Sequence, residues 1–131
     1  MNDTPYAVLA PQDMNPMFAR AFNSADIENL LALYEPEGQL VRQDGQVDVG
    51  LDAVRDNLQN FLRLGGMMTS ENVYAVVSGD LALLRARWRL TTTTPDGQPL
   101  SLEGHTAEVV RRQPDGRWLY VVDHPFGAEP L

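Results

Sequence analysis

The spacing of apolar residues changes once along this chain, at Gly65-Gly66, and the change limits the folds that the chain can adopt. Before that point apolar side chains recur every three or four residues, as on one face of a helix. After it they alternate, as in a strand that is buried on one side. Helices followed by strands favour an α+β domain, with the helices packed on one face of a sheet.

Three helices are predicted in the first half. Asn15-Pro16 is typical of a helix start, with asparagine as the cap and proline at the first position. A second helix begins after Ser24 or Asp26 and ends before Pro36, since the residue preceding a proline avoids the helical region. One face of this second helix carries the apolar residues Ile27, Leu30, Leu31 and Tyr34.

A hairpin and a third helix complete the first half. Residues 39–42 and 46–49 flank Asp44-Gly45, a dipeptide typical of tight hairpin turns. The third helix is expected from about residue 51 to 64, ending at the glycine pair. Together these segments place two helices and a hairpin before the third helix.

Four strands are predicted after the glycine pair, at residues 71–78, 81–94, 100–113 and 117–124. The second of them alternates cleanly. One face carries Leu84, Ala86, Trp88 and Leu90, and the other carries Arg85, Arg87 and Arg89. The sequence therefore predicts a sheet with one apolar face toward the helices and one charged face away from them.

Composition excludes several classes of function. A formal net charge of -8 would repel a phosphate backbone, so the chain is not expected to bind nucleic acid. The chain has no cysteine and no lysine, which excludes thiol chemistry and Schiff-base catalysis, and its two histidines lack local metal-ligand spacing. No cofactor or metal is expected. The first sixteen residues lack the features of a secretory signal and no apolar run could span a membrane, so a cytoplasmic protein is expected.

Three stretches resemble a known family: residues 25–28 leading to Leu33-Tyr34, residues 50–53, and residues 109–124 with the core RRQPDGRW. Over residues 15–125 the chain resembles the NTF2-like superfamily, and more narrowly its SnoaL-like and ketosteroid-isomerase-like small bacterial proteins. The resemblance implies a cone-shaped α+β fold in the order α-α-β-β-α-β-β-β-β, with three helices on a curved antiparallel sheet. We expect an N-terminal arm at residues 1–14 and one domain at 15–131.

The resemblance also allows a comparison with the isomerases of the superfamily, which use a tyrosine, a carboxylate base and a protonated carboxylic acid. The tyrosine falls on Phe18, which has no hydroxyl, and the base falls on Arg42. The acid falls on Glu108, or on Thr106 if the alignment shifts by two residues. Two of the three groups are altered, so the classical isomerase set is not intact. The arrangement of carboxylates and arginine used by epoxide hydrolases of the superfamily is not matched either.

Alternation along the strands predicts which side chains face an enclosed cavity. The expected ligand-binding residues are apolar or small polar ones from helices and strands: Phe18, Phe22, Tyr34, Phe61, Trp88, Thr106 and Val121. Glu108 and Asp123 lie on neighbouring strands, and if their carboxyl groups are close and shielded from water, one of them should have a raised pKa and could act as an acid or base. They and His124, which points to the opposite face from Asp123, are the candidate catalytic residues. Each could equally be structural.

The last predicted strand is apolar on both faces, which requires a cover on each side. Helices can cover one face, and a second copy of the chain is the natural cover for the other. The expected homodimer uses the convex sheet face, with Arg85, Arg87, Arg89, Trp118 and Tyr120. Two functions follow: a protein that binds a small apolar molecule without turnover, or an isomerase, cyclase or dehydratase that uses the carboxylates.

Overall fold

A computed structural model describes residues 5–129 of the chain. The helical elements are a short 3-10 helix, η1, and three α-helices: η1 (Pro11–Asp13), α1 (Met14–Asn23), α2 (Ile27–Leu31) and α3 (Leu51–Leu62). In this part of the chain, seven strands form a single sheet: β1 (Tyr34–Val41), β2 (Val47–Val49), β3 (Met67–Ser78), β4 (Leu81–Thr93), β5 (Pro99–His105), β6 (Ala107–Arg112) and β7 (Trp118–His124). The predicted α+β architecture is confirmed.

The sheet has the strand order β2-β1-β7-β6-β4-β3, and β5 pairs with the outer half of β4. All pairs are antiparallel except β1 and β7, which run parallel, so the sheet is mixed rather than purely antiparallel. This parallel pair matters for the site, because it places Leu40 directly opposite Asp123. The predicted hairpin across Asp44-Gly45 is confirmed as the β1–β2 pair.

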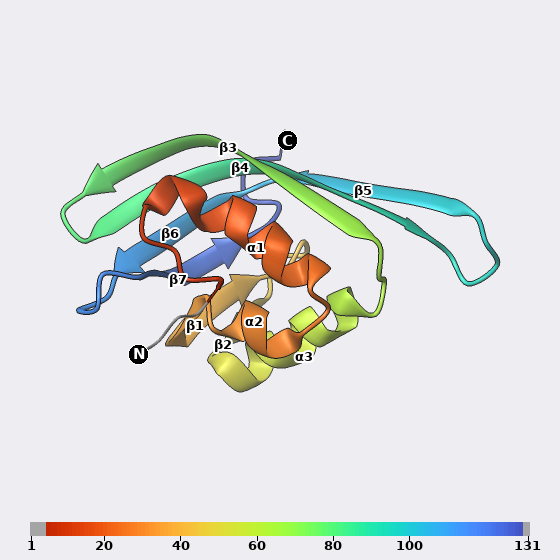
Figure 1. The fold of residues 1–131 in the computed structure, drawn as a ribbon, viewed down its shortest axis with the longest axis horizontal. Helices are drawn as coiled ribbons and strands as arrows, with labels where there is room; N and C mark the ends of the chain where they lie inside the picture. The colour runs from red at the N-terminus through yellow and green to blue at the C-terminus, as the bar shows by residue number, and fades with distance from the viewer. Residues whose placement is uncertain (1–4, 130–131) are drawn as a thin grey trace.

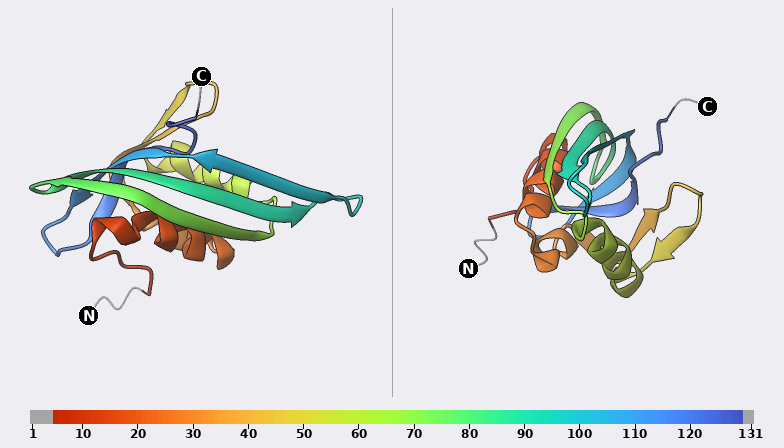
Figure 2. Two further views of the ribbon diagram at one scale, coloured as in Figure 1. Left: turned by 90° about the horizontal axis from the view of Figure 1, so that it is seen from above. Right: turned by 90° about the vertical axis from the view of Figure 1, so that its right-hand side faces the viewer.

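The helices lie together on one side of the sheet, which curves around them (Figure 1; Figure 2, right). The core is formed where α1, α2 and α3 meet the inner face of β4, β6 and β7, with Phe22, Leu30, Leu84 and Val110 all buried. At the far end the β4–β5 hairpin extends well beyond the helices (Figure 2, left). Within residues 5–129, the fold therefore leaves one face of the sheet covered by helices and the other face uncovered.

The N-terminal part differs from the prediction. The first α-helix begins at Met14, because Pro11 already starts a helical turn, and Asn15 lies inside the helix rather than capping it. Val8 is buried, and its carbonyl accepts a hydrogen bond from the Trp118 amide. The division into an arm at 1–14 and a domain at 15–131 stays a prediction.

The second helix is shorter than predicted. Asp26 caps it as expected, since its side chain accepts a hydrogen bond from the Glu28 amide. The helix ends at Leu31, however, and Tyr34 is the first residue of β1 rather than the last of the helix. The i+7 spacing of Tyr34 wrongly predicted a longer helix. The side chain of Tyr34 is buried in the core, as on a helix face, but the residue lies on a strand.

The predicted strand at 100–113 is two strands. Thr106 separates β5 from β6, and its hydroxyl accepts a hydrogen bond from the Ala86 amide at 2.8 Å. A side chain thus replaces a backbone carbonyl in the ladder to β4. The break bends the chain, so that β5 and β6 pair with different halves of the same strand.

A β-bulge in β7 changes which of its residues face the helices. Val109 pairs with Val122, but Val110 pairs with Tyr120, so Val121 is an extra residue in the ladder. Tyr120 and Asp123 consequently share the inner face, although they are three residues apart. The expectation that Tyr120 and Trp118 lie on the convex face is wrong, because both are buried in the core. An extra residue reverses the alternation on which that expectation depended.

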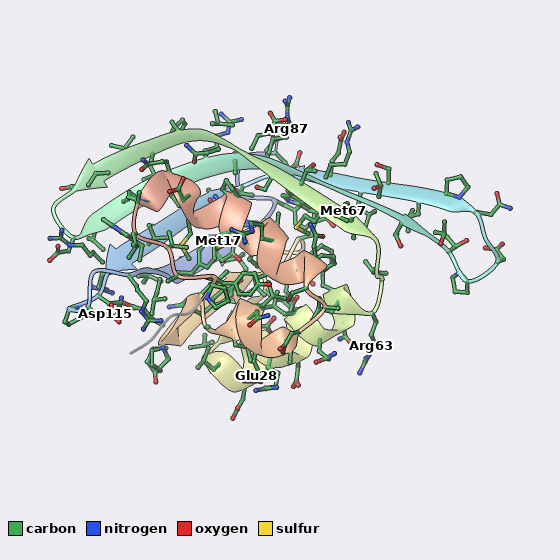
Figure 3. All side chains as sticks on the ribbon, in the orientation of Figure 1. Met17, Glu28, Arg63, Met67, Arg87 and Asp115 are labelled. Atoms are coloured by element: carbon green, nitrogen blue, oxygen red, sulfur yellow. The ribbon has the colours of Figure 1, made fainter. Side chains whose placement is uncertain are left out.

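The arginine row lies on the outer face as predicted. Arg87 points away from α1, on the far side of the sheet from the helices (Figure 3). It forms a 3.2 Å ion pair with Glu71, and Arg89 pairs with Glu103 at 3.1 Å. Arg85 lies on the same face and is half-buried.

Within residues 5–129, no helix has the length and apolar character needed to cross a membrane.

Candidate functional site

A cavity of about 590 Å³ lies between the inner face of the sheet and helices α1 and α3. This volume suits a small organic molecule. Its wall is mainly apolar and aromatic, formed by Phe18, Leu58, Phe61, Met68, Trp88, Leu102 and Phe126. Five polar side chains lie on the buried part of the lining: Asn15, Thr106, Glu108, Tyr120 and Asp123. Exposed Gln43, Asn60 and Leu64 mark its mouth.

Glu108 is held by donors from two directions. The Asn15 side-chain amide donates to its Oε1 at 3.1 Å, and the Thr106 hydroxyl donates to the same oxygen at 2.7 Å. The Tyr120 hydroxyl in turn donates to the side-chain Oδ1 of Asn15 at 2.6 Å. Because Oε1 already accepts two hydrogen bonds, a proton on this carboxyl is best placed on Oε2.

Asp123 lies directly opposite Glu108 in the ladder between β6 and β7. Its Oδ2 accepts a hydrogen bond from the Tyr34 hydroxyl at 2.5 Å. Tyr34 reaches it from β1, which runs parallel to β7, and packs against Tyr120 with ring centroids 4.9 Å apart. Two buried carboxyl groups therefore sit side by side, each oriented by its own set of donors.

Burial changes the proton affinity of these groups. It raises the pKa of Asp123 to about 6, against the lowering effect of the Tyr34 hydrogen bond. Burial and then the negative charge of Asp123 raise the pKa of Glu108 well above its usual value. Two adjacent buried carboxyl groups do not ionise independently, so the pair gives up its second proton at a higher pH than an exposed carboxyl group, and the charge of Asp123 adds to the effect of burial on Glu108.

The predicted cavity residues divide into two groups. Phe18, Phe61, Trp88 and Thr106 line the cavity, as do Glu108 and Asp123. Phe22, Tyr34 and Val121 do not belong to this lining. The ring of Phe22 packs against that of Phe61, with centroids 5.0 Å apart, and the Tyr34 hydroxyl donates a hydrogen bond to Asp123. Val121 is the extra residue of the bulge.

His124 stands apart from the carboxyl pair. It follows Asp123 on the strand, is absent from the cavity lining, and its Nδ1 accepts a long 3.3 Å hydrogen bond from the Phe126 amide. Partial burial lowers its pKa. The geometry gives His124 no direct contact with a molecule in the cavity, in contrast to Glu108 and Asp123.

Sequence reasoning placed Tyr34 and Thr106 at the cavity, but it missed Asn15 and Tyr120 and did not show that Tyr34 orients Asp123. Asn15 was assigned to a helix cap, Tyr34 to a helix face and Tyr120 to the outer face of the sheet. A signal for Asn15 was present, because Pro11 could already have started the helix three residues earlier. Nothing in the sequence marked the bulge that turns Tyr120 inward.

Arg42 occupies the mouth of the cavity. Its Nε and Nη2 donate to the two oxygens of Asp48 at 3.0 and 2.6 Å, and Asn57 donates to Asp48 as well, at 2.9 Å. These hydrogen bonds lower the pKa of Asp48. The guanidinium is thus fixed against β2 and α3 while its side chain remains 48% exposed.

Across residues 5–129, no group of three or more histidines and carboxylates could hold a metal ion.

Comparison with protein families identifies the chain. A SnoaL-like domain matches residues 17–121, which is most of the sequence. The chain belongs to the SnoaL-like domain family. In this family context, the four positions that the isomerase alignment singled out, Phe18, Arg42, Thr106 and Glu108, all line one cavity.

Solved structures with the same fold support this placement of the SnoaL-like chain. A ketosteroid isomerase-like protein from Erwinia carotovora atroseptica is 23% identical, with a TM-score of 0.77, over 99% of this chain and 100% of that one. An NTF2-like superfamily protein from Salmonella enterica is 18% identical, with a TM-score of 0.68 and 87% of each chain covered.

A conserved protein from Planctomyces limnophilus is 18% identical, with a TM-score of 0.72 over 83% of this chain and 86% of that one. Comparison with curated proteins gave no significant match. At these identities the likeness shows a shared fold, and the activity has to be argued from the SnoaL-like site itself.

Proposed function

We propose that this SnoaL-like protein binds a small, mainly apolar molecule in its cavity and holds a carbonyl or hydroxyl group of that molecule against Glu108 and Asp123. The observation that carries the proposal is a carboxyl pair at the buried end of an aromatic-walled cavity of about 590 Å³. Burying two carboxyl groups is unfavourable unless they gain partners, and a ligand's polar group would supply one.

The two carboxyl groups offer a ligand complementary hydrogen bonds. A protonated Glu108 can donate from Oε2 to a carbonyl oxygen, since its Oε1 is occupied by Asn15 and Thr106. An ionised Asp123 can accept from a hydroxyl, since the Tyr34 hydroxyl occupies only its Oδ2. Aromatic walls such as Trp88 and Phe61, which meet edge to face at 5.7 Å, would contact the apolar body.

Native mass spectrometry of the purified protein tests this proposal. We expect an additional mass on the folded protein that is released on denaturation, and we expect Glu108→Gln to lower its occupancy. The exposed Glu71→Gln, which changes the same residue type on the outer face, is the matched control. A wild-type protein that carries no adduct and binds no member of a panel of apolar carbonyl compounds would contradict the proposal.

A second candidate function is acid–base catalysis in the same cavity, of the isomerase, cyclase or dehydratase type. The observation that favours it is the placement of two buried carboxyl groups directly opposite each other in the β6–β7 ladder, where one can act as an acid while the other acts as a base. In such a step Asp123 takes a proton from carbon next to a carbonyl group while Glu108 donates to the carbonyl oxygen. Exchange of ligand C–H protons for deuterium in D₂O, lost in Asp123→Asn, would support turnover over binding alone.

The outer sheet face supports a further proposal, that two copies associate through it. Four apolar residues lie in register across four strands on this face: Val76, Leu83, Val109 and Val122. Val76 is 57% and Leu83 is 45% exposed within the single chain. Trp118 and Tyr120 have no part in this surface, and Arg85, Arg87 and Arg89 continue it along β4.

A further inference from the structure

We infer that the ligand of this cavity is an anion, with its negative group at the mouth against Arg42 and its apolar body inside. The inference rests on the proposed function and specifies its ligand class. Among the described residues that line the cavity, Arg42 is the one with a positive charge, and the exposed carboxylate of the lining, Glu103, is paired with Arg89. A mainly apolar cavity with one arginine at its entrance fits an amphiphilic molecule with a carboxylate or similar group.

The position of Arg42 follows from the register of the sheet. Leu40 lies opposite Asp123 in the parallel β1–β7 pair, and both line the cavity. Arg42 lies two residues beyond Leu40 and directly follows the last residue of β1, about 6.6 Å away in extended backbone. Its amide donates to the Gln46 carbonyl across the hairpin, and its side chain, like that of Leu40, lines the cavity. A single ligand can therefore contact the carboxyl pair with one group and the guanidinium with another.

The guanidinium is oriented before any ligand arrives. Asp48 is only 7% exposed, and it accepts hydrogen bonds from Nε and Nη2 of Arg42 and from the Asn57 amide. Within the described chain, Nη1 has one long contact, 3.4 Å to Gln46 Oε1. An arginine has five N–H donors, so donors on Nη1 and Nη2 remain for an incoming anion.

Because Arg42 is paired with Asp48, selectivity for an anionic ligand must come from direct contact with the guanidinium and not from long-range attraction. The net charge of -8 repels anions at a distance, and Asp48 balances the charge of Arg42 locally. A bound anion would instead gain charge-assisted hydrogen bonds from a guanidinium whose orientation is already fixed.

A matched pair of fluorescent probes tests the inference. Anilinonaphthalene sulfonate and N-phenyl-naphthylamine share one aromatic framework, and only the former carries a negative group. We expect the two probes to compete for one site in the wild-type protein. In Arg42→Gln we expect the sulfonate probe to bind roughly tenfold more weakly, with the neutral probe changed less than about twofold.

Two further variants separate local charge from folding. The double variant Arg42→Gln with Asp48→Asn removes both charges and leaves no unpaired carboxylate. It should lose its preference for the sulfonate probe to the same extent as Arg42→Gln alone. Arg55→Gln removes an arginine of α3 that pairs with Glu28 outside the cavity lining, and it should bind both probes like the wild type.

The outcomes distinguish this inference from the proposed function. If both probes bind competitively but Arg42→Gln weakens them equally or not at all, the anion inference is overturned while the binding function stands. If the sulfonate probe fails to compete with the neutral one, it binds elsewhere and the inference is again overturned. If neither probe binds the folded wild-type protein, the proposed function fails and the inference fails with it.

Discussion

Glu108 and Asp123 face each other across the β6–β7 ladder, with both carboxyl groups buried on the inner side of the sheet. Because burial raises the pKa of both groups, the folded protein binds protons that the unfolded chain has already released. This relationship makes stability, ligand binding and any proton transfer depend on pH through the same two residues.

The first prediction is that the protein becomes less stable as pH rises. Asp123 has a folded pKa of about 6, above the value near 3.9 of an unfolded aspartate. Its ionisation therefore lowers the free energy of unfolding between about pH 4 and pH 6, by about 3 kcal/mol in all, and Glu108 extends the decline to higher pH. Urea unfolding at a series of pH values measures this slope.

Neutral variants provide the control for that slope. Glu108→Gln and Asp123→Asn should each flatten the decline and raise the free energy of unfolding at pH 8 by about 1–3 kcal/mol. Asp44→Asn, an exposed residue of the β1–β2 turn, should leave it unchanged. The same dependence of stability on pH from 5 to 8 in the wild type and in both neutral variants would show that the pair is not buried in the protonated form.

The second prediction concerns the Tyr34 hydroxyl, which donates to Asp123 at 2.5 Å. Tyr34→Phe removes a hydrogen bond that favours the ionised carboxylate, so the pKa of Asp123 should rise further above 6. The free energy of unfolding should fall by about 1–2 kcal/mol at pH 8, and by less at pH 5, where Asp123 is protonated. Carboxyl-carbon NMR titration measures the pKa directly.

Tyr74→Phe is the matched control, because Tyr74 lies on β3 with 42% of its surface exposed. It should change neither the titration of Asp123 nor the stability. An unchanged Asp123 titration in Tyr34→Phe would mean that the Tyr34 hydroxyl bonds elsewhere in solution.

The third prediction concerns Gly104, which makes room for the cavity wall. A Cβ at this position would lie 2.5 Å from Trp88 Nε1 and 2.8 Å from the Pro125 carbonyl oxygen. Gly104→Ala should therefore displace the indole and break its 3.0 Å hydrogen bond to Pro125. We expect a loss of about 1–3 kcal/mol in stability and a shift in tryptophan fluorescence.

Ser101→Ala places the same alanine side chain at an exposed position of the same strand, β5, and is the matched control. If Gly104→Ala matches the stability and emission of Ser101→Ala, the indole does not pack against this backbone. Because Trp88 also contacts Phe126 at 5.7 Å, a real displacement should alter probe binding in the cavity too.

The sequence was sufficient for the architecture and for half of the carboxyl network. Hydrophobic spacing predicts the helices, the hairpin and the strands, and alternation correctly places Leu84, Trp88 and Glu108 on the inner face. Asp123 was also correctly placed there, although the same alternation was wrong for the residues just before it on β7. Tyr120 lies inward and Val121 is extra, because a bulge shifts the register by one residue.

The remaining errors share a physical cause: contacts between distant segments override local signals. Asn15 has the local signature of a cap, yet its side chain bonds Glu108, 93 positions away. Tyr34 has helical spacing, but pairing of β1 with β7 extends the chain there instead. Arg42 was identified only by alignment, because its role depends on Asp48 and Asn57 meeting at the cavity mouth.

The last prediction is that the chain forms a homodimer through the outer sheet face. Leu83 lies at the centre of the apolar row on that face, between Val76 on β3 and Val109 on β6. Light scattering should give a mass of twice the 14.6 kDa of one chain at micromolar concentration. Leu83→Glu should convert the protein to monomers, because two like charges would meet in an apolar interface. Thr93→Glu, which adds the same charge at the far end of β4, should leave the dimer intact. A wild-type mass equal to one chain would remove the dimer from consideration, and the outer face would then be an exposed surface of a monomer.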